Sequence, residues 1–595
     1  MLNQSNKAID VLKRLLPYII CALFILLSVT RLLSLNERSL SVPFIYDGGD
    51  SAVTFYRTFE MKTDHALFDF NQLGSPYGSS TYDFYVFDIG LYIIQFVIAV
   101  LSPNYVVAFN VFLIGGAWFD GFASLYALRR LKFSTPLAIS LSVVYAQMCY
   151  FYVRYHNHTY LAYYFAAPLA ICMAIELYRG EFVCSFKKEE RKQTIINLLL
   201  LVIIGTTGIY YAVFSCIYFL LVLVLRGMED LKIKSILPSC KAIGATAFGF
   251  FLGVLPPVIY WMKNGVGYMF KMRTGYLWGG EVFGVKLTEL VLPNVAYRFA
   301  RIRKIRESYN ESFGITEAMA ASLGLLFTIG LIIALIYIFR IANTDKKHIM
   351  RPVSLLMVAS LLIVTKGGLG TFFAMIFPFV RCYNRMCVYI AFLCAISVAW
   401  FLTMIYDIIK KKLKGKKALT IALQVVSVVL LAVMMVGGVY EQTFVMGNPE
   451  PSIKVAYTED RDMMLDLVDY AHTLDSDDEM VDVMFFPFMD FPENARDTGG
   501  KLWGYEPMML CAHSEYLAMS YGFPRGREYA DKLSELENLT MDEKIDYAID
   551  NGFDGIMIAR EAMEAIAPDD IYVLAERFGD PDFYNYRYYY WSLED

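Results

Sequence analysis

Long apolar runs separated by charged segments dominate the first three quarters of the chain. Most runs are close to the length of about 20 residues that spans a membrane as a helix. The run 194–226 would be about 50 Å long as one helix, and Gly205 and Gly208 interrupt it, so we expect a hairpin of two helices. The runs are 15–33, 84–101, 105–128, 136–152, 160–178, 194–226, 240–260, 318–340, 352–365, 386–406 and 418–439.

Basic residues gather in five of the segments between these runs. Short basic loops stay on the cytoplasmic side of a membrane, so we expect all five clusters and the N-terminus inside. The run 84–101 contains Asp88 and Gln95, and if it crossed it would place every later basic cluster outside. We therefore expect it to lie along the outer interface. The sequence predicts a polytopic α-helical membrane protein of about 11 spans, with its N-terminus inside and its C-terminus outside. The basic clusters are 129–132, 179–192, 226–241, 340–351 and 410–417.

The charge balance reverses near Tyr440, where the apolar runs stop. Residues 440–595 carry 35 acidic and 11 basic side chains, whereas the first 439 residues carry 23 acidic and 42 basic ones. This shift predicts a membrane module over 1–439 and an acidic extracytoplasmic α/β domain over 440–595. The acidic surface favours neutral or cationic ligands over anionic polymers, or serves only solubility, and we expect no nucleic-acid partner. Expected elements are helices at 460–474 and 545–550, and strands at 481–488, 553–559 and 584–591.

The first outer loop, residues 34–104, contains an acidic cluster at Asp47 and Asp50. A carboxylate facing water at the membrane can act as a general base or bind a divalent cation such as Mg²⁺ or Mn²⁺. Asp50 and Asp83 are the candidate metal ligands. An alternative interpretation is a Gly/Asp turn that caps a helix at Ser51, with Asp83 in a solvated loop.

A short outer turn carries Arg154, His156 and His158. A His-x-His pair can ligate a metal, and a single histidine can protonate or orient a phosphate. The alternative is packing within the aromatic belt at the membrane surface.

Several arginines on the expected outer side are candidate ligands for a phosphate. Arg381 and Arg385 precede a predicted span and lie four residues apart, so we expect them to share a helix face and clamp one phosphate. A snorkelling role that sets topology is the alternative. Arg273 in the loop 261–317 is a third candidate, and the basic cluster 298–306 is expected to form a surface helix.

Taken together, these features resemble the GT-C superfamily of bacterial membrane glycosyltransferases, and most closely its YfhO-like and related branches. The resemblance rests on four motifs, and it implies that Asp50 is the catalytic or metal-binding residue and that a helix lies flat in the first outer loop. The adjacent acidic pair often seen in the family is here replaced by Asp47 and Asp50 with two glycines between them. The motifs are Gly48-Gly49-Asp50, Leu73-Gly74-x-Pro76-x-Gly78 with Asp83, Arg154-x-His156-x-His158, and Arg381 with Arg385.

The sequence and this resemblance predict an enzyme of the bacterial plasma membrane that works on the outer face. It would transfer a sugar from a polyprenyl-phosphate-linked donor to an envelope glycan, lipid or polymer, in contact with membrane lipids. The catalytic candidates are Asp47, Asp50, His156 and His158, and the donor-phosphate candidates are Arg154, Arg273, Arg381 and Arg385.

Two other functions stay open. A flippase for lipid-linked saccharides would carry charges buried within the membrane and two related halves, whereas the spans are nearly free of charge and no repeat is evident. A non-catalytic scaffold would use the acidic domain to dock envelope-assembly partners.

Overall fold

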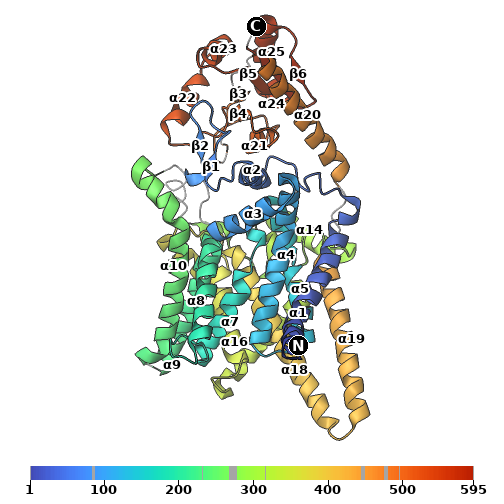
Figure 1. The fold of residues 1–595 in the computed structure, drawn as a ribbon. Coiled ribbons are helices and arrows are strands. Elements are labelled where there is room, and N and C mark those ends of the chain that lie inside the picture. Colours follow the sequence, from blue (N-terminus) through green and yellow to red (C-terminus); the bar gives the residue numbers. More distant parts are fainter. Residues whose placement is uncertain are drawn as a thin grey trace.

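The computed structural model describes residues 2–83, 88–230, 232–266, 278–314, 317–443, 449–474, 480–492, 494 and 496–593. A bundle of helices forms one part of the molecule, and a mixed α/β unit is stacked on one end of it (Figure 1). The C-terminus lies at the far tip of the α/β unit, while the N-terminus lies toward the opposite end of the bundle.

Every run predicted to span the membrane is helical. Among the described residues, eight helical stretches are long and apolar enough to cross a membrane. They contain α1 (Leu2–Leu32), α4 (Tyr105–Arg130), α5 (Thr135–Ala146) with α6 (Cys149–Asn157), α9 (Ile209–Asp230), α10 (Ile233–Asn264), α15 (Gly324–Tyr337), α18 (Cys387–Lys412) and α19 (Lys417–Gln442). Three expected spans are shorter helices, namely α7 (Ala166–Arg179), α8 (Arg191–Thr206) and α16 (Met350–Val364). The number of spans and their orientation therefore stay predictions.

The run 194–226 forms the expected hairpin. Helix α8 ends at Thr206 and α9 begins at Ile209. Gly208 between them has φ of +101°, a left-handed conformation that glycine adopts without strain.

Short elements cover the end of the bundle that carries the α/β unit. Helix α3 (Ile89–Leu101) has 13 residues and is about 20 Å long, shorter than a membrane span, and it runs across that end (Figure 1). The basic segment 298–306 lies mostly in a helix, α14, as predicted. The remaining elements here are α2 (Asp50–Thr63), β1 (Asp69–Phe70), β2 (Ser79–Ser80), α12 (Gly279–Phe283), α13 (Leu287–Val291), α14 (Ala300–Phe313) and α17 (Leu369–Ile376).

The α/β unit is built on a five-stranded sheet of order β4-β3-β5-β7-β6. Strand β3 (Val481–Phe486) is parallel to β4 (Leu517–Met519) and β5 (Gly555–Ala559), whereas β7 (Tyr588–Ser592) is antiparallel to β5 and β6 (Phe583–Tyr584). The helices of this unit are α20 (Glu450–Leu474), α21 (Glu506–Cys511), α22 (Glu528–Leu536), α23 (Met541–Asp550), α24 (Arg560–Ile566) and α25 (Pro568–Phe578).

Most elements expected in the α/β unit are present, with shifted ends. The single strand predicted over 584–591 is wrong, because the chain turns back between β6 and β7. The Asn585 side chain holds this turn by accepting hydrogen bonds from the backbone N–H groups of Arg587 and Tyr588, at 2.7 and 2.8 Å.

Part of the segment 34–104, the predicted first outer loop, packs on the β4 edge of this sheet. The Met519 N–H donates to the carbonyl of Gln72 at 2.9 Å, and the Ser75 N–H donates to the carbonyl of Met519 at 3.0 Å. The Tyr505 N–H donates to the carbonyl of Gly48 at 2.9 Å. One cluster of buried apolar side chains extends from α1 to β7, so the described parts of the loop, the bundle and the sheet share a continuous core.

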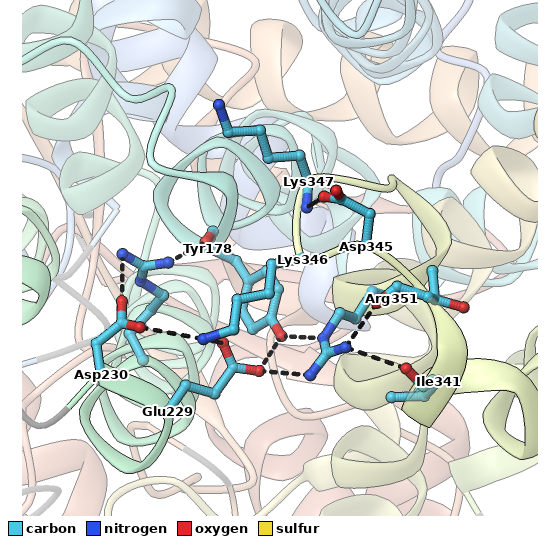
Figure 2. Close-up of polar contacts among 10 residues, drawn as sticks. Tyr178, Glu229, Asp230, Ile341, Asp345, Lys346, Lys347 and Arg351 are labelled. Carbon is cyan, nitrogen blue, oxygen red and sulfur yellow. Dashed lines mark hydrogen bonds and ion pairs between the residues drawn. The ribbon is translucent and has the colours of Figure 1, made fainter.

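A cluster of polar contacts joins the ends of three helices (Figure 2). The Arg351 guanidinium donates to the Tyr178 hydroxyl at 2.8 Å, to a Glu229 carboxylate oxygen at 3.0 Å and to the Ile341 carbonyl at 3.0 Å. Lys346 Nζ lies 3.1 Å from an Asp230 carboxylate oxygen. These contacts join α7, α9 and α16, and with them the predicted cytoplasmic loops.

Candidate active site

A cavity of about 300 Å³ opens at the end of the bundle that carries the α/β unit. It lies between α2, the turn after α6, the tip of the α8–α9 hairpin and the segment before α18. Four predicted site residues line it together, namely Asp50, His158, Arg381 and Arg385. The other charged lining residues are Arg57 and Asp88.

Helix α2 presents one face to this cavity. Asp50 is its first residue, where a negative charge is stabilised by the helix dipole. The lining residues of α2 are spaced at i, i+3, i+4 and i+7, which places them on one side of a helix. They are Asp50, Val53, Thr54 and Arg57.

Asp47 forms the turn that precedes α2. Its Oδ1 accepts a hydrogen bond from the Gly49 N–H at 3.1 Å and another from the Ser51 hydroxyl at 2.8 Å. This is the turn geometry that the capping interpretation predicts for a Gly/Asp segment. Asp47 therefore positions Asp50 and does not line the cavity itself.

The two histidines of the outer turn face different carboxylates. His158 Nε2 lies 3.7 Å from Asp50 Oδ2 in the cavity, whereas His156 Nε2 lies 3.5 Å from Asp47 Oδ2 outside it. Burial, reinforced by the charges of Arg154 and Arg385, lowers the pKa of His158 to about 3. The His158 imidazole is therefore neutral at physiological pH and can accept a proton or a hydrogen bond.

Arg57 is a buried cation that the sequence analysis missed. Arg57 is only 2% exposed, and its guanidinium lies 4.2 Å from the centroid of the Tyr92 ring. One nitrogen donates to the Tyr160 hydroxyl at 2.9 Å, while Nε and Nη2 have no hydrogen-bond partner among the described residues. A buried cation with unused donors is costly unless an anion joins it. Its position seven residues after Asp50, on the same helix face, is the signal that could have identified it.

Glu317 serves as a shared counter-ion for two arginines. Its Oε1 lies 2.8 Å from Arg154 and 3.1 Å from Arg385. Burial tends to raise the pKa of Glu317, but the charges of Arg385 and Arg154 prevail and lower it to about 2. Arg154 is thus held behind the cavity wall and does not line the cavity, whereas Arg385 lies over the Tyr210 ring, 4.1 Å from its centroid, and reaches it.

The expectation that Arg381 and Arg385 share a helix face is wrong. Arg385 lies in a short 3₁₀ turn (Tyr383–Met386), and Arg381 precedes that turn in irregular chain. Both reach the same cavity because the chain bends just before α18 begins at Cys387. Arg381 lies against the Phe283 ring, 5.3 Å from its centroid.

The residues that the structure describes do not assemble a metal site. No three His, Cys, Asp or Glu side chains among them gather closely enough to hold an ion. The carboxylates on the described cavity wall are those of Asp50 and Asp88. The Asp83 side chain and the whole of Arg273 lie outside the described part of the chain, so their predicted roles stay predictions.

No family model and no curated protein matches this sequence. Among solved structures, the chain is similar to the archaeal oligosaccharyltransferase AglB from Archaeoglobus fulgidus in complex with an inhibitory peptide and a dolichol-phosphate. That match has 13% identity and a TM-score of 0.43, and covers 96% of this chain and 72% of that one. The chain is also similar to ArnT from Cupriavidus metallidurans bound to undecaprenyl phosphate, with 10% identity, a TM-score of 0.45, and coverage of 96% and 97%. Identities and TM-scores this low establish neither a shared fold nor a shared activity.

Proposed function

We propose that this protein transfers a sugar from a polyprenyl-phosphate-linked donor to a hydroxyl of an envelope acceptor, on the outer face of the bacterial plasma membrane, as a GT-C enzyme of the YfhO-like type. The observation that carries the proposal is one cavity in which Asp50 lies beside a neutral His158 and shares the wall with Arg57, Arg381 and Arg385. The wall thus combines a carboxylate base with cations suited to a phosphate.

The arginines would hold the donor phosphate. When the bond between the sugar C1 and the phosphate oxygen breaks, its electron pair leaves with the phosphate, and negative charge grows there. Fixed guanidinium groups stabilise such charge, and each can bind phosphate oxygens through two N–H groups. Arg57 and Arg385 are already buried, so little reorganisation is needed on binding.

Asp50 would accept the proton of the acceptor. The acceptor oxygen attacks C1 as the sugar passes through an oxocarbenium-like state, and its proton moves to the Asp50 carboxylate. His158, neutral and 3.7 Å away, orients that carboxylate or takes the proton onward. The products are the glycosylated acceptor and the free polyprenyl phosphate.

The test is transfer of a radiolabelled sugar from membrane polyprenyl-phosphate donors by purified full-length protein. We expect Asp50→Asn to lower the rate by about 10³-fold, the usual contribution of a general base. Asp64→Asn at the other end of α2 is the control and should retain the wild-type rate. Wild-type transfer by a folded Asp50→Asn protein would refute this mechanism. Loss of transfer in Asp50→Asn alone would support a base, whereas loss both in Asp50→Asn and in wild type with EDTA would indicate a carboxylate-held cation.

A flippase for lipid-linked saccharides is the second candidate function, and Asp120 is the observation that favours it. This residue is fully buried within α4, although the spans are otherwise expected to be nearly free of charge. A flippase uses such buried acids. Movement of a lipid-linked saccharide across proteoliposomes, lost in Asp120→Asn and retained in Asp50→Asn, would favour it over the transferase.

A further inference from the structure

A second cavity, of about 330 Å³, lies between the first outer loop and the α/β unit. The loop contributes Tyr46, Asp47 and Gly48, and the α/β unit contributes the opposite wall. A volume of this size matches the lower end of the range for small-ligand sites.

Two aromatic side chains on the wall of this cavity are largely exposed. Trp503 is 68% exposed and Tyr586 is 51% exposed. Two large exposed rings beside one cavity offer an apolar surface on which a ligand can pack. Their flat faces suit the apolar C–H face of a sugar ring, and their polar groups stay available for hydroxyls.

The two cations on this wall are both paired with carboxylates. Arg587 contacts both Asp460 and Glu506, and Lys501 Nζ lies 3.4 Å from a Glu561 carboxylate oxygen. Because both cations already have carboxylate partners, the wall offers polar contacts without a strong preference for an anion. A neutral ligand rich in hydroxyl groups fits this surface better than a phosphate does.

The segment Tyr46–Asp50 connects the two cavities. Gly48 lies so close to the α/β unit that a Cβ there would overlap the Trp503 Cβ. Asp47 lines the second cavity, whereas Asp50 lines the first. Three residues span at most about 10 Å, so the wall of the second cavity at Asp47 lies near the base in the first.

We propose that this second cavity, with Trp503 and Tyr586, binds a neutral saccharide segment of the acceptor. The role of this saccharide as acceptor rests on the proposed glycosyl transfer, whereas binding of a saccharide in this cavity does not. It assigns the acceptor to a neutral oligosaccharide or a glycan that carries one.

The test measures binding of three tritiated trisaccharides, cellotriose, chitotriose and mannotriose, to the full-length protein in nanodiscs without donor. We expect at least one to bind, and Trp503→Ala and Tyr586→Ala each to weaken its binding roughly tenfold. Tyr572→Ala removes a tyrosine that is 72% exposed on α25, and binding should not change. Hydroxyl-radical footprinting should show that the bound trisaccharide protects Trp503.

Each outcome separates the two proposals. Binding of none of the three at millimolar concentration, or binding that Trp503→Ala leaves intact, would overturn the saccharide site even if Asp50-dependent transfer is observed. Binding that depends on Trp503, in a wild-type protein that transfers no sugar from any donor, would retain the site and overturn its role as acceptor site. Binding should survive Asp50→Asn, because that residue lines the other cavity.

Discussion

At the residue scale, Arg154 and Arg385 both depend on Glu317 for their charge compensation. Replacing it in Glu317→Gln leaves two buried guanidinium groups without their shared carboxylate. Breaking a buried pair in this way costs about 3 kcal/mol, so we expect a clear fall in melting temperature in detergent. Glu307→Gln is the matched control, because Glu307 forms an exposed pair with Arg303 and such pairs contribute less than about 1 kcal/mol. Equal shifts for both variants would contradict the shared counter-ion.

The same residue predicts a dependence of stability on pH. The pKa of Glu317 lies near 2 in the folded protein, below its ordinary value of 4.5. Below 4.5 the unfolded chain therefore binds a proton that the folded chain does not. We expect the Glu317 contribution to be complete above pH 4.5 and to be lost as the pH falls toward 2. Melting curves of wild type and Glu317→Gln should converge over that interval, and a constant difference would refute this assignment.

His158 gives a second prediction at this scale. Because its pKa is lowered to about 3, its imidazole should stay neutral between pH 5 and 8, where an ordinary histidine titrates. The protein has six histidines, so ¹⁵N spectra of histidine-labelled protein are simple, and His158→Gln assigns the signal. A His158 signal that titrates near pH 6.5 would contradict the neutral imidazole.

At the element scale, the tip of the α8–α9 hairpin leaves no room for a side chain at Gly208 in the cavity wall. In Gly208→Ala, the new Cβ would overlap Asp88 Oδ1, and φ of +101° is unfavourable for alanine. We expect a loss of about 1–3 kcal/mol in stability, together with weaker donor binding, measured by thermal unfolding and equilibrium binding. Gly244→Ala, in α10 with open space around it, should be neutral or slightly stabilising. A stable Gly208→Ala protein would show that this tip tolerates a side chain.

The helices and strands were more predictable from the sequence than the tertiary contacts between them. Run length and charge identified the helices, and the Gly205–Gly208 interruption identified the hairpin, because these signals are local. Asp50, His158, Arg381 and Arg385 stood out as titratable or charged side chains where a membrane protein has few. Glu317 did not, because its partner Arg154 is 163 positions away and only tertiary folding brings them together.

At the scale of the whole molecule, Gly48 is a close contact between the segment before α2 and the start of α21 in the α/β unit. In Gly48→Ala the added Cβ would overlap Trp503 and lie 2.7 Å from the Glu506 Cβ. We expect the Tyr505 amide, which donates to the Gly48 carbonyl, to exchange its hydrogen at least about tenfold faster as the contact opens. Gly504→Ala, whose Cβ would meet its nearest neighbours only at 3.9 Å, is the control. Unchanged exchange in Gly48→Ala would mean that the contact adapts.

The pairing of Gln72–Ser75 with β4 also has a consequence for solubility. Strand β4 is the outermost strand on its side of the sheet, and an uncovered strand edge offers free N–H and C=O groups to any other chain. The loop occupies those groups within the same molecule. A fragment that contained only the α/β unit would leave them open and would tend to self-associate by adding strands edge to edge. The segment Gln72–Ser75 therefore protects the β4 edge from strand addition, and this protection requires the full-length chain.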